Sequence, residues 1–580
     1  MLTRLILATA LVVVSAPQGP AATFYVSTNG GDNSPGNEAQ PWRTIQKAAN
    51  TMSAGDTVYV QSGHFDERVT TVRGGAAPEN RITFRAIGTV TMKGFAVQHP
   101  FITVDGFDIT GATSASNSDA YVAVSKTGDW FELLNCTVRD GIQAVRNDMV
   151  FEPPNKISSS TGGFLAAGFV PGMTVQFYRA TNVALANGEK SFLVSSVTDT
   201  SLVFATSAIA ADGPKPTYLT GSAIYGLYLA DGTDNCLFRS NRFSNLSYRY
   251  WFVQGSNHLF EANILEHNNG WDLIFFMGAD HKFVRNLFQN NGWGTFIPSP
   301  DVFDCWPVKY ERITFSNNFV INMMGVINAQ KYNKTVSGPF WIKNNVFVDV
   351  GWLSIRMPNT TFENNTLLRV ARQANALVQV EKHPLIFDLG DYATNAVIRN
   401  NIFVDCGQAT GPTTPDQVGW YRFLGPTNTV TLENNFVAGS APNYDAKTGF
   451  PEPDPTLNGG DPGFVNLDDP LGPDGVPFTA DDGLRLRADS KLVGKGAGLV
   501  DLGAYNTRPP LPRLSIALSP PTNIQLSWPT SANTFELQSA LTLTSPWSAV
   551  EVAPTIEGRS FVATFGHTNP ATFFRLRQVP

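Results

Sequence analysis

The sequence predicts an all-β fold built as a solenoid, in which short parallel strands wind coil upon coil around one core. The first observation is a repeated pattern: an apolar residue, then Asn or Asp three positions later, then an apolar residue two positions further on. Its polar residue stands at Asp105, Asn241, Asn263, Asn286, Asn318, Asn345, Asn365, Asn401 and Asn435. The second observation is the spacing, which from Asn241 onward is 22, 23, 32, 27, 20, 36 and 34 residues. A repeat near 20 residues that is only ever lengthened indicates a coil that accepts loops.

Each repeat is interpreted as a strand, a one-residue polar bend and a second strand. Asn tolerates the left-handed conformation of such a bend, and stacked Asn side chains can hydrogen-bond from coil to coil. The flanking apolar residues are expected to point into a continuous core. Aligning the repeats also predicts one longer strand in each coil. These long strands are expected at about Arg249–Val253, Asp272–Phe276, Gly294–Pro298, Gly325–Gln330, Trp352–Met357 and Leu377–Lys382.

Two end segments strengthen the solenoid prediction and carry a resemblance to a known family. TFYVSTNGGDNSPGNEAQPWRTIQKAANTMSAGDTVYVQSGHFDERV, near the start, predicts a short strand, a capping helix around Trp42–Ser53 and the first coil. DPGFVNLDDPLGPDGVPFTADDGLRLRADSKLVGKGAGLVDLGAY, near the end, is similar to closing coils. The chain thereby resembles the pectate-lyase-like superfamily over residues 23–506. The resemblance implies a right-handed parallel β-helix with a groove along its long-strand sheet.

Three further regions do not follow the coil rhythm. Between the first coils (23–147) and the main coils (220–506), residues 148–219 show short alternating strands and turn residues, which predict a small inserted β-barrel. Residues 507–513 are a Pro-rich linker. Residues 514–580 alternate in period two and predict an immunoglobulin- or fibronectin-like β-sandwich, with Trp528 and Trp547 in its core or on a sugar-binding surface.

Composition and the N-terminus bear on location and partners. Residues 1–22 have a basic start, an apolar run and small residues at a plausible cut, as in a secretory signal peptide. We therefore expect secretion, extracellular or periplasmic, with no membrane span. The net charge of −7 argues against nucleic acid as a partner. A monomer is expected, with its four cysteines as buried free thiols because distant coils cannot bring them together.

Polar and aromatic residues on the long strands predict the site. If Leu273 and Phe275 point inward, Asp272 faces outward, because neighbouring strand residues alternate between faces. A polar exposed face with tryptophans nearby suits a polysaccharide. The catalytic candidates are Asp272, Asp301, Asp304, Lys331 and Arg356. The substrate-binding candidates are Trp251, Trp271, Trp293, Trp306, Lys309, Asn328, Gln330, Gln379, Glu381, Lys382 and His383.

The candidate residues fit two reactions and one non-catalytic alternative. In β-elimination of a uronate-containing glycan, which the resemblance favours, Asp272, Asp301 and Asp304 would hold Ca²⁺ and Lys331 would be the base. In inverting hydrolysis, Asp272 with Asp301 or Asp304 would serve as acid and base. The third possibility is an adhesive β-helix that binds glycans without cleaving them.

Two other groups of residues have side chains that could catalyse a reaction or bind a metal ion. Asp280 and His281 occupy the same turn positions as Asn257 and His258 one coil earlier, so we expect them to shape the turn rather than to form a catalytic dyad. Residues 468–483 combine five aspartates with glycine turns and predict either a Ca²⁺ site or an acidic closing loop. The aspartates are Asp468, Asp469, Asp474, Asp481 and Asp482.

Overall fold

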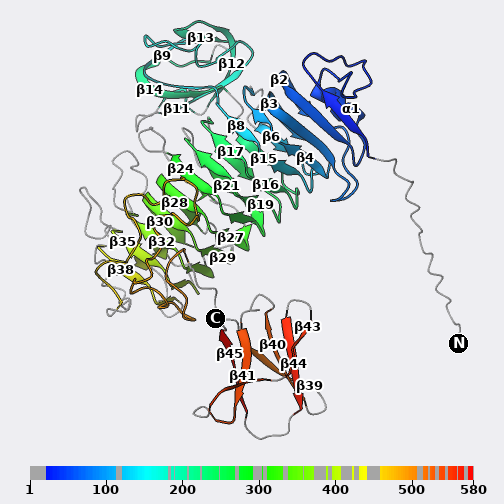
Figure 1. Ribbon diagram of the computed structural model, residues 1–580. Coiled ribbons are helices and arrows are strands. Elements are labelled where there is room, and N and C mark those ends of the chain that lie inside the picture. The colour runs from blue at the N-terminus through cyan, green and yellow to red at the C-terminus, as the bar shows by residue number, and fades with distance from the viewer. Residues whose placement is uncertain are drawn as a thin grey trace, which may run out of the picture. The chain divides into compact units, whose positions relative to one another are not determined.

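The computed structural model describes most of the chain (Figure 1). The described residues are 21–112, 120–179, 185–188, 190–205, 208–221, 225–246, 249–267, 273–291, 303–304, 310–330, 338–356, 358–370, 387–389, 395–406, 421–423, 430–439, 457–505, 514–519, 523–529, 535–542, 546–550, 552–557, 560–566 and 572–578. The fold is almost entirely β, and its largest sheet is a parallel sheet of 28 strands. The predicted fold class is confirmed.

The first elements close the N-terminal end of the solenoid. The described helix α1 (Ile45–Thr51) begins at Thr44, whose side chain accepts a hydrogen bond from the backbone N–H of Lys47. Ile45 and Ala48 on α1 are buried in the solenoid core, which confirms the predicted capping helix. The strands around it are β1 (Thr23–Val26), β2 (Thr57–Thr70), β3 (Ile82–Val97), β4 (Ile102–Asp105) and β5 (Asp108–Ile109).

The later coils contribute to two rows of short strands and, as far as β30, to a row of long strands, and equivalent strands pair in parallel from coil to coil. The first short-strand row is β7 (Glu132–Leu134), β16 (Leu237–Arg239), β19 (Leu259–Glu261), β23 (Lys282–Val284), β27 (Ile313–Ser316), β29 (Phe340–Lys343), β31 (Thr360–Glu363), β34 (Val397–Arg399) and β37 (Thr431–Glu433). The second short-strand row is β8 (Thr137–Arg139), β17 (Arg242–Ser244), β20 (Ile264–Glu266), β24 (Leu287–Asn291), the starts of β28 (Phe319–Gln330) and β30 (Val346–Arg356), β32 (Thr366–Leu368), β35 (Ile402–Val404) and β38 (Phe436–Ala438). The long-strand row is β6 (Ala120–Val124), β15 (Tyr225–Leu229), β18 (Arg249–Val253), β21 (Ile274–Phe276), β25 (Phe303–Asp304) and the ends of β28 and β30.

The asparagines of the repeat form the predicted ladder. From Asn241 to Asn401, the backbone N–H and the side-chain amide of each asparagine donate to the Oδ1 of the asparagine one coil later. The ladder ends at Asn435, and the asparagines are buried. The bend, however, has two residues. The left-handed conformation belongs to the residue before the ladder asparagine, for example Ala262 (φ 54°) and Arg285 (φ 57°), and not to the asparagine itself.

The turn after the long strand requires glycine. Gly255 (φ 83°) and Gly278 (φ 104°) lie there in adjacent coils. A Cβ at Gly255 would stand 1.8 Å from the carbonyl oxygen of Thr233 in the preceding coil, so only glycine fits.

Aromatic side chains fill the solenoid core. Phe238 stacks on Phe260 at 4.8 Å between ring centroids, and Phe260 stacks on Phe283 at the same distance. All three are fully buried. Cys136, Cys236 and Cys406 are buried free thiols, as predicted, and burial raises the pKa of Cys136 and of Cys236 to about 12. Cys305 lies outside the described residues.

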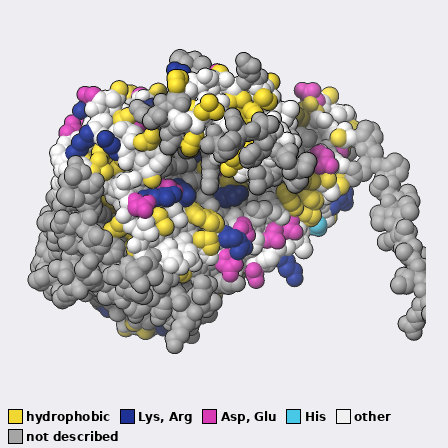
Figure 2. Space-filling view, turned by 90° about the horizontal axis from the view of Figure 1, so that it is seen from below, with side chains coloured by type: hydrophobic (Ala, Val, Ile, Leu, Met, Phe, Trp, Pro, Cys, Tyr) yellow, Lys and Arg dark blue, Asp and Glu magenta, His cyan; other side chains and the backbone are white. Residues whose placement is uncertain are grey.

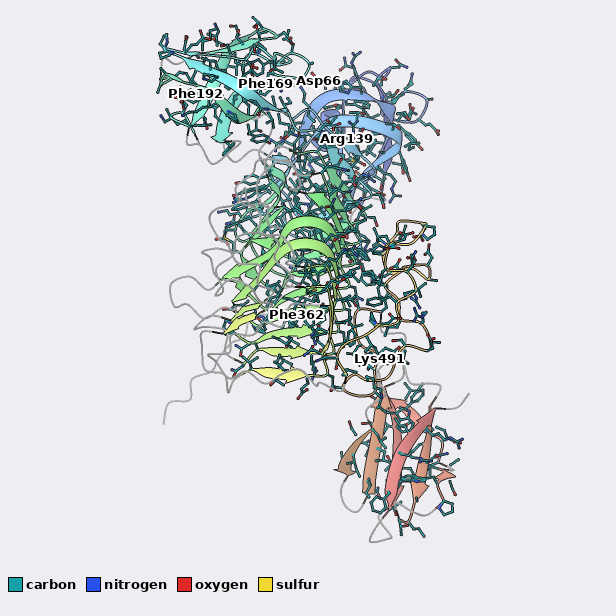
Figure 3. All side chains as sticks on the ribbon, turned by 90° about the vertical axis from the view of Figure 1, so that its left-hand side faces the viewer. Asp66, Arg139, Phe169, Phe192, Phe362 and Lys491 are labelled. Carbon is teal, nitrogen blue, oxygen red and sulfur yellow. The ribbon has the colours of Figure 1, made fainter. Side chains whose placement is uncertain are left out.

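A closed antiparallel barrel interrupts the coils between β8 and β15. Its strands are β9 (Gln143–Glu152), β10 (Lys156–Ser158), β11 (Thr174–Arg179), β12 (Ser191–Val197), β13 (Ser201–Phe204) and β14 (Asp212–Thr220). The barrel has its own core, which includes Phe169 and Phe192. Figure 3 shows these two side chains among the barrel strands and Phe362 among the coils.

The C-terminal module consists of two antiparallel sheets. One contains β39 (Ser515–Ser519), β40 (Asn523–Pro529), β43 (Thr555–Glu557) and β44 (Ser560–Gly566), and the other β41 (Phe535–Ala540), β42 (Ser548–Ala549) and β45 (Phe573–Gln578). Trp528 is buried in the core of this module. Two small parallel pairs complete the fold: β22 (Gly278–Ala279) with β26 (Tyr310–Glu311), and β33 (Phe387–Leu389) with β36 (Tyr421–Phe423).

Candidate functional site

The outer face of the long-strand row begins with stacked aromatic rings. The register pairs Tyr228 with Phe252 and Phe252 with Phe275 in successive coils. The Tyr228 and Phe252 rings stack at 5.3 Å, and the Phe252 and Phe275 rings stack at 5.2 Å. The guanidinium of Arg249 lies 4.9 Å from the centroid of the Phe275 ring. These residues form an aromatic row that the sequence analysis did not predict.

This geometry corrects two predictions. Trp251 is predicted to bind substrate, but its side chain is fully buried in the solenoid core, where it stacks on Phe260 at 4.6 Å. Phe275 was expected to point inward, but it belongs to the aromatic row, whereas Ile274 and Phe276 are the long-strand residues in the core. Leu273 is in the core, as predicted.

The same register continues the aromatic row as a line of polar residues. Phe275 pairs with Asp304, Asp304 with Asn328, and Asn328 with Ser354. Stacked strands are about 4.8 Å apart, so these backbone positions follow one another along the solenoid axis. Two positions further along the strands, Gln330 pairs with Arg356. The register therefore aligns the backbone positions of Asp304, Asn328 and Ser354 with that of Phe275, and the position of Gln330 with that of Arg356.

The position of Asp304 differs from the sequence prediction. The long strand of this coil was expected at Gly294–Pro298, with Asp304 in a loop after it. The strand that pairs with β21 is instead β25, which contains Asp304 itself. Most of the extra residues of this coil therefore precede its long strand, because Leu287 follows its partner Ile264 by 23 positions and Asp304 follows its partner Phe275 by 29. Asp304 occupies a sheet position between Phe275 and Asn328.

The remaining predicted site residues cannot be placed. They lie outside the described residues: Trp271, Asp272, Trp293, Asp301, Trp306, Lys309, Lys331, Gln379, Glu381, Lys382 and His383.

The outer face of the first short-strand row has a different character. Glu261 pairs with Arg239 at 2.7 Å and with Arg285, and Glu363 pairs with Lys343 at 2.9 Å and with Arg399 at 2.6 Å. Burial would raise the pKa of Glu363, but hydrogen bonds from Arg399 and Lys343 outweigh it and hold that pKa below its ordinary value. In Figure 2, basic and acidic side chains also lie next to one another on the face seen from below.

The turn histidines are structural, as predicted. The rings of His258 and His281 stack at 5.0 Å, and their Nε2 atoms contact the carbonyl oxygens of Gln254 and Met277. Burial lowers the pKa of His258 to about 3 and that of His281 to about 4. Asp280, which pairs with Arg312 at 2.8 Å, has its pKa lowered by that hydrogen bond. Two neutral histidines and a paired aspartate form no catalytic dyad.

Three of the five aspartates of the closing segment come together. Carboxylate oxygens of Asp474, Asp481 and Asp482 lie within 4.8 Å of one another, a group that could hold a metal ion. Asp482 is buried, which raises its pKa, although Tyr505 donates a hydrogen bond to it. The hydroxyl of Thr479 donates to Asp481 at 2.5 Å, and this bond lowers the pKa of Asp481. Asp468 and Asp469 are not part of this group.

Comparisons with known proteins identify similar structures but no family. No family model matches the sequence, and no curated protein matches it. Similar solved structures include a pectate lyase, Pel9A, at 14% identity and a TM-score of 0.42, covering 84% of this chain and 97% of that one. A PL6 alginate lyase in complex with a trisaccharide matches at 14% identity and a TM-score of 0.37, covering 76% and 88%. XylC with xylose matches at 11% identity and a TM-score of 0.34, covering 96% and 100%.

Proposed function

We propose that the protein is a secreted carbohydrate-active enzyme that cleaves a polysaccharide on the outer face of its long-strand row. The observation that carries this proposal is the register of Asp304, Asn328 and Ser354 directly beyond the aromatic row. A groove floor with an apolar part and a polar part suits a sugar chain, which offers both C–H faces and hydroxyl groups. In the described part of the chain, no helix reaches the length and hydropathy of a membrane span.

β-Elimination of a uronate-containing glycan is the favoured reaction. Arg356, two strands from Asp304, would neutralise the uronate carboxyl group, and Lys331 would remove the proton beside it. The C–O bond to the leaving sugar then breaks, a double bond forms in the uronate ring, and the released oxygen takes up a proton from water. Bound Ca²⁺, held by Asp304 with Asp272 and Asp301, would help neutralise the same carboxyl group. Inverting hydrolysis would instead need a second carboxylate near Asp304, supplied by Asp272 or Asp301.

Product analysis separates the possible functions. The secreted protein would be incubated with pectic, alginate, sulfated fucan and xylan substrates, with and without EDTA. An unsaturated product that absorbs in the ultraviolet supports elimination, and a saturated product formed equally well with EDTA supports hydrolysis. Binding of a polysaccharide without release of any product would contradict the proposed enzyme and leave a glycan-binding protein.

We propose further that the aspartate group of the closing segment binds Ca²⁺. Its donors are carboxylate oxygens, the ligands that Ca²⁺ prefers. At a free concentration of 100 times its dissociation constant, a single bound ion would stabilise the fold by about 2.7 kcal/mol. Calorimetric titration should show one bound Ca²⁺ fewer for Asp474→Ala than for the control Asp468→Ala, in the same segment. No calcium binding, or equal binding by both variants, would contradict the proposal.

A further inference from the structure

A cavity lies where the inserted barrel leaves the coils. Its volume is about 550 Å³, within the range of small-ligand sites. The lining comes from the residues that lead from β8 into β9, together with Ala167 of the barrel and Asn245 of the next coil. We name it the seam cavity. We propose that it binds one acidic sugar unit of the polysaccharide, an inference that rests on the proposed function.

The polar wall of the seam cavity is held in place by a chain of hydrogen bonds. Asn245 donates to Asp140 at 3.1 Å, Gln143 donates to Asn245 at 2.9 Å, and the hydroxyl of Tyr218 donates to Gln143 at 2.8 Å. Tyr218 is buried and belongs to β14. The chain therefore links two coils with both strands that connect the barrel to the solenoid. Side chains fixed in this way lose little conformational freedom when a ligand binds.

Arg146 is the group on this wall that suits an anion. Asp140 accepts a hydrogen bond from Asn245 and pairs with Arg139, which it shares with Asp108 and which is labelled on the N-terminal coils in Figure 3. Arg146 donates through Nε to the carbonyl of Gly162 and through Nη1 to its neighbour Val145. Among the residues that the structure describes, no carboxylate pairs with Arg146, and its Nη2 makes no hydrogen bond. A guanidinium with a free N–H group at a cavity wall is suited to a carboxylate or sulfate.

The rest of the lining suits the apolar face of a sugar ring. Ala144 is buried in the barrel core, so the apolar part of the lining comes from Ala167, which is partly exposed, and from Val145, which is 40% exposed. A pyranose offers hydroxyls at its edge and C–H groups on its face, so amides, a guanidinium and small apolar side chains on one wall match it. The connection to the long-strand face is short: β14 ends at Thr220, and β15, which carries Tyr225 and Tyr228, starts five residues later. A barrel at this point can hold part of the polymer beside the groove.

Calorimetry on the full chain tests the proposal with matched ligands. Galacturonic and glucuronic acid are the acidic probes, and galactose and glucose are their neutral counterparts. We expect the acids to bind at least about tenfold more tightly than the neutral sugars, as expected for one charge-assisted contact. Arg146→Gln should remove this preference, and Ala167→Phe should block binding by filling the cavity. Arg239→Gln, which removes an arginine from the short-strand face, should bind like the wild type.

The outcomes separate this inference from the proposed function. If both Arg146→Gln and Ala167→Phe bind the acids with the same affinity and stoichiometry as the parent protein, the binding belongs elsewhere and the seam cavity is overturned as a site. The absence of any binding overturns it as well. Thermal melts establish whether the variants fold. If Arg146→Gln does not fold, Ala167→Phe alone provides the test. Binding is measured in the Asp304→Asn background. If Asp304→Asn abolishes polysaccharide cleavage but no acid binds in the seam cavity, only this inference is overturned. If acid binds in the seam cavity but the wild type cleaves no polysaccharide, only the enzymatic function is overturned.

Discussion

The two outer faces of the coils belong to different rows of strands and carry different side chains. On the short-strand face, Glu261 and Glu363 each contact two basic side chains from neighbouring coils, so the charges compensate one another. On the long-strand face, stacked rings give way to Asp304 and Asn328 at the same register positions. Compensated charges on an exposed sheet stabilise it little and leave few groups for a ligand. The comparison is the reason why the long-strand face, and not the charge-rich one, is proposed as the face that binds a ligand.

The largest effect is expected on kcat, for a substitution on the long-strand face. Asp304→Asn should lower kcat by about 10²- to 10⁴-fold, the usual contribution of a group that transfers a proton or holds developing charge. Its matched control is Glu261→Gln, which removes one carboxylate from the short-strand face. Initial rates on the best polysaccharide substrate provide the measurement. Full activity of Asp304→Asn, or an equal loss in both variants, would break the comparison.

A second expected effect concerns stability and distinguishes the core from the faces. Phe283→Ala removes a fully buried ring that stacks on Phe260, and should cost about 3–5 kcal/mol of unfolding free energy. Phe252→Ala, in the partly exposed aromatic row, should cost less, because the stacking part of such a contact is about 0.5–1.5 kcal/mol. Urea denaturation measures both variants. A near-zero effect for Phe283→Ala would show that the assigned inward register is wrong.

The two buried histidines in the turns after the long strands should make the free energy of unfolding depend on pH. His258 and His281 are buried and neutral, with pKa values of about 3 and about 4 against 6.5 for an ordinary histidine. The unfolded chain therefore takes up protons that the folded chain does not, and stability falls as pH falls from about 6.5 toward 4. For His281 the shift corresponds to about 3 kcal/mol. Urea midpoints between pH 7 and pH 4 measure this, and a flat profile would contradict the buried neutral assignment.

The smallest expected effect lies on the short-strand face. Glu261→Gln breaks pairs whose basic partners are largely exposed, so it should change the unfolding free energy by no more than about 1 kcal/mol and become smaller still in high salt. Thermal melts at low and high salt are the measurement. A loss of several kcal/mol would mean that this face is more than a solvated surface.

The sequence predicts the coils well because their pattern is local. An apolar residue, an asparagine and another apolar residue recur once per coil, and the ladder from Asn241 to Asn435 follows directly. The exact bend could not be assigned, since Ala262 and Arg285 take the left-handed conformation without being typical turn residues. The asparagines that follow them are typical turn residues, so the left-handed conformation was wrongly assigned to the asparagines.

The site is less predictable than the fold for two physical reasons. In RYWFV and LIFF the long strands are almost wholly apolar, so alternation cannot show which residues face inward, and Trp251 and Phe275 were both assigned to the wrong side. In the coil of β25, the inserted residues could precede or follow the long strand, and sequence spacing does not distinguish these cases. Only the pairing of Asp304 with Phe275 and Asn328 does so.

Amide hydrogen exchange with and without a bound oligosaccharide tests the central claim most directly. The protein would be the Asp304→Asn variant, in which the substrate stays intact. Binding on the long-strand face should slow exchange in the peptides that cover 325–330 of β28 and 352–356 of β30, and leave the short strands β27, β29 and β31 unchanged. Protection of the short strands with no change in β28 and β30 would contradict the account.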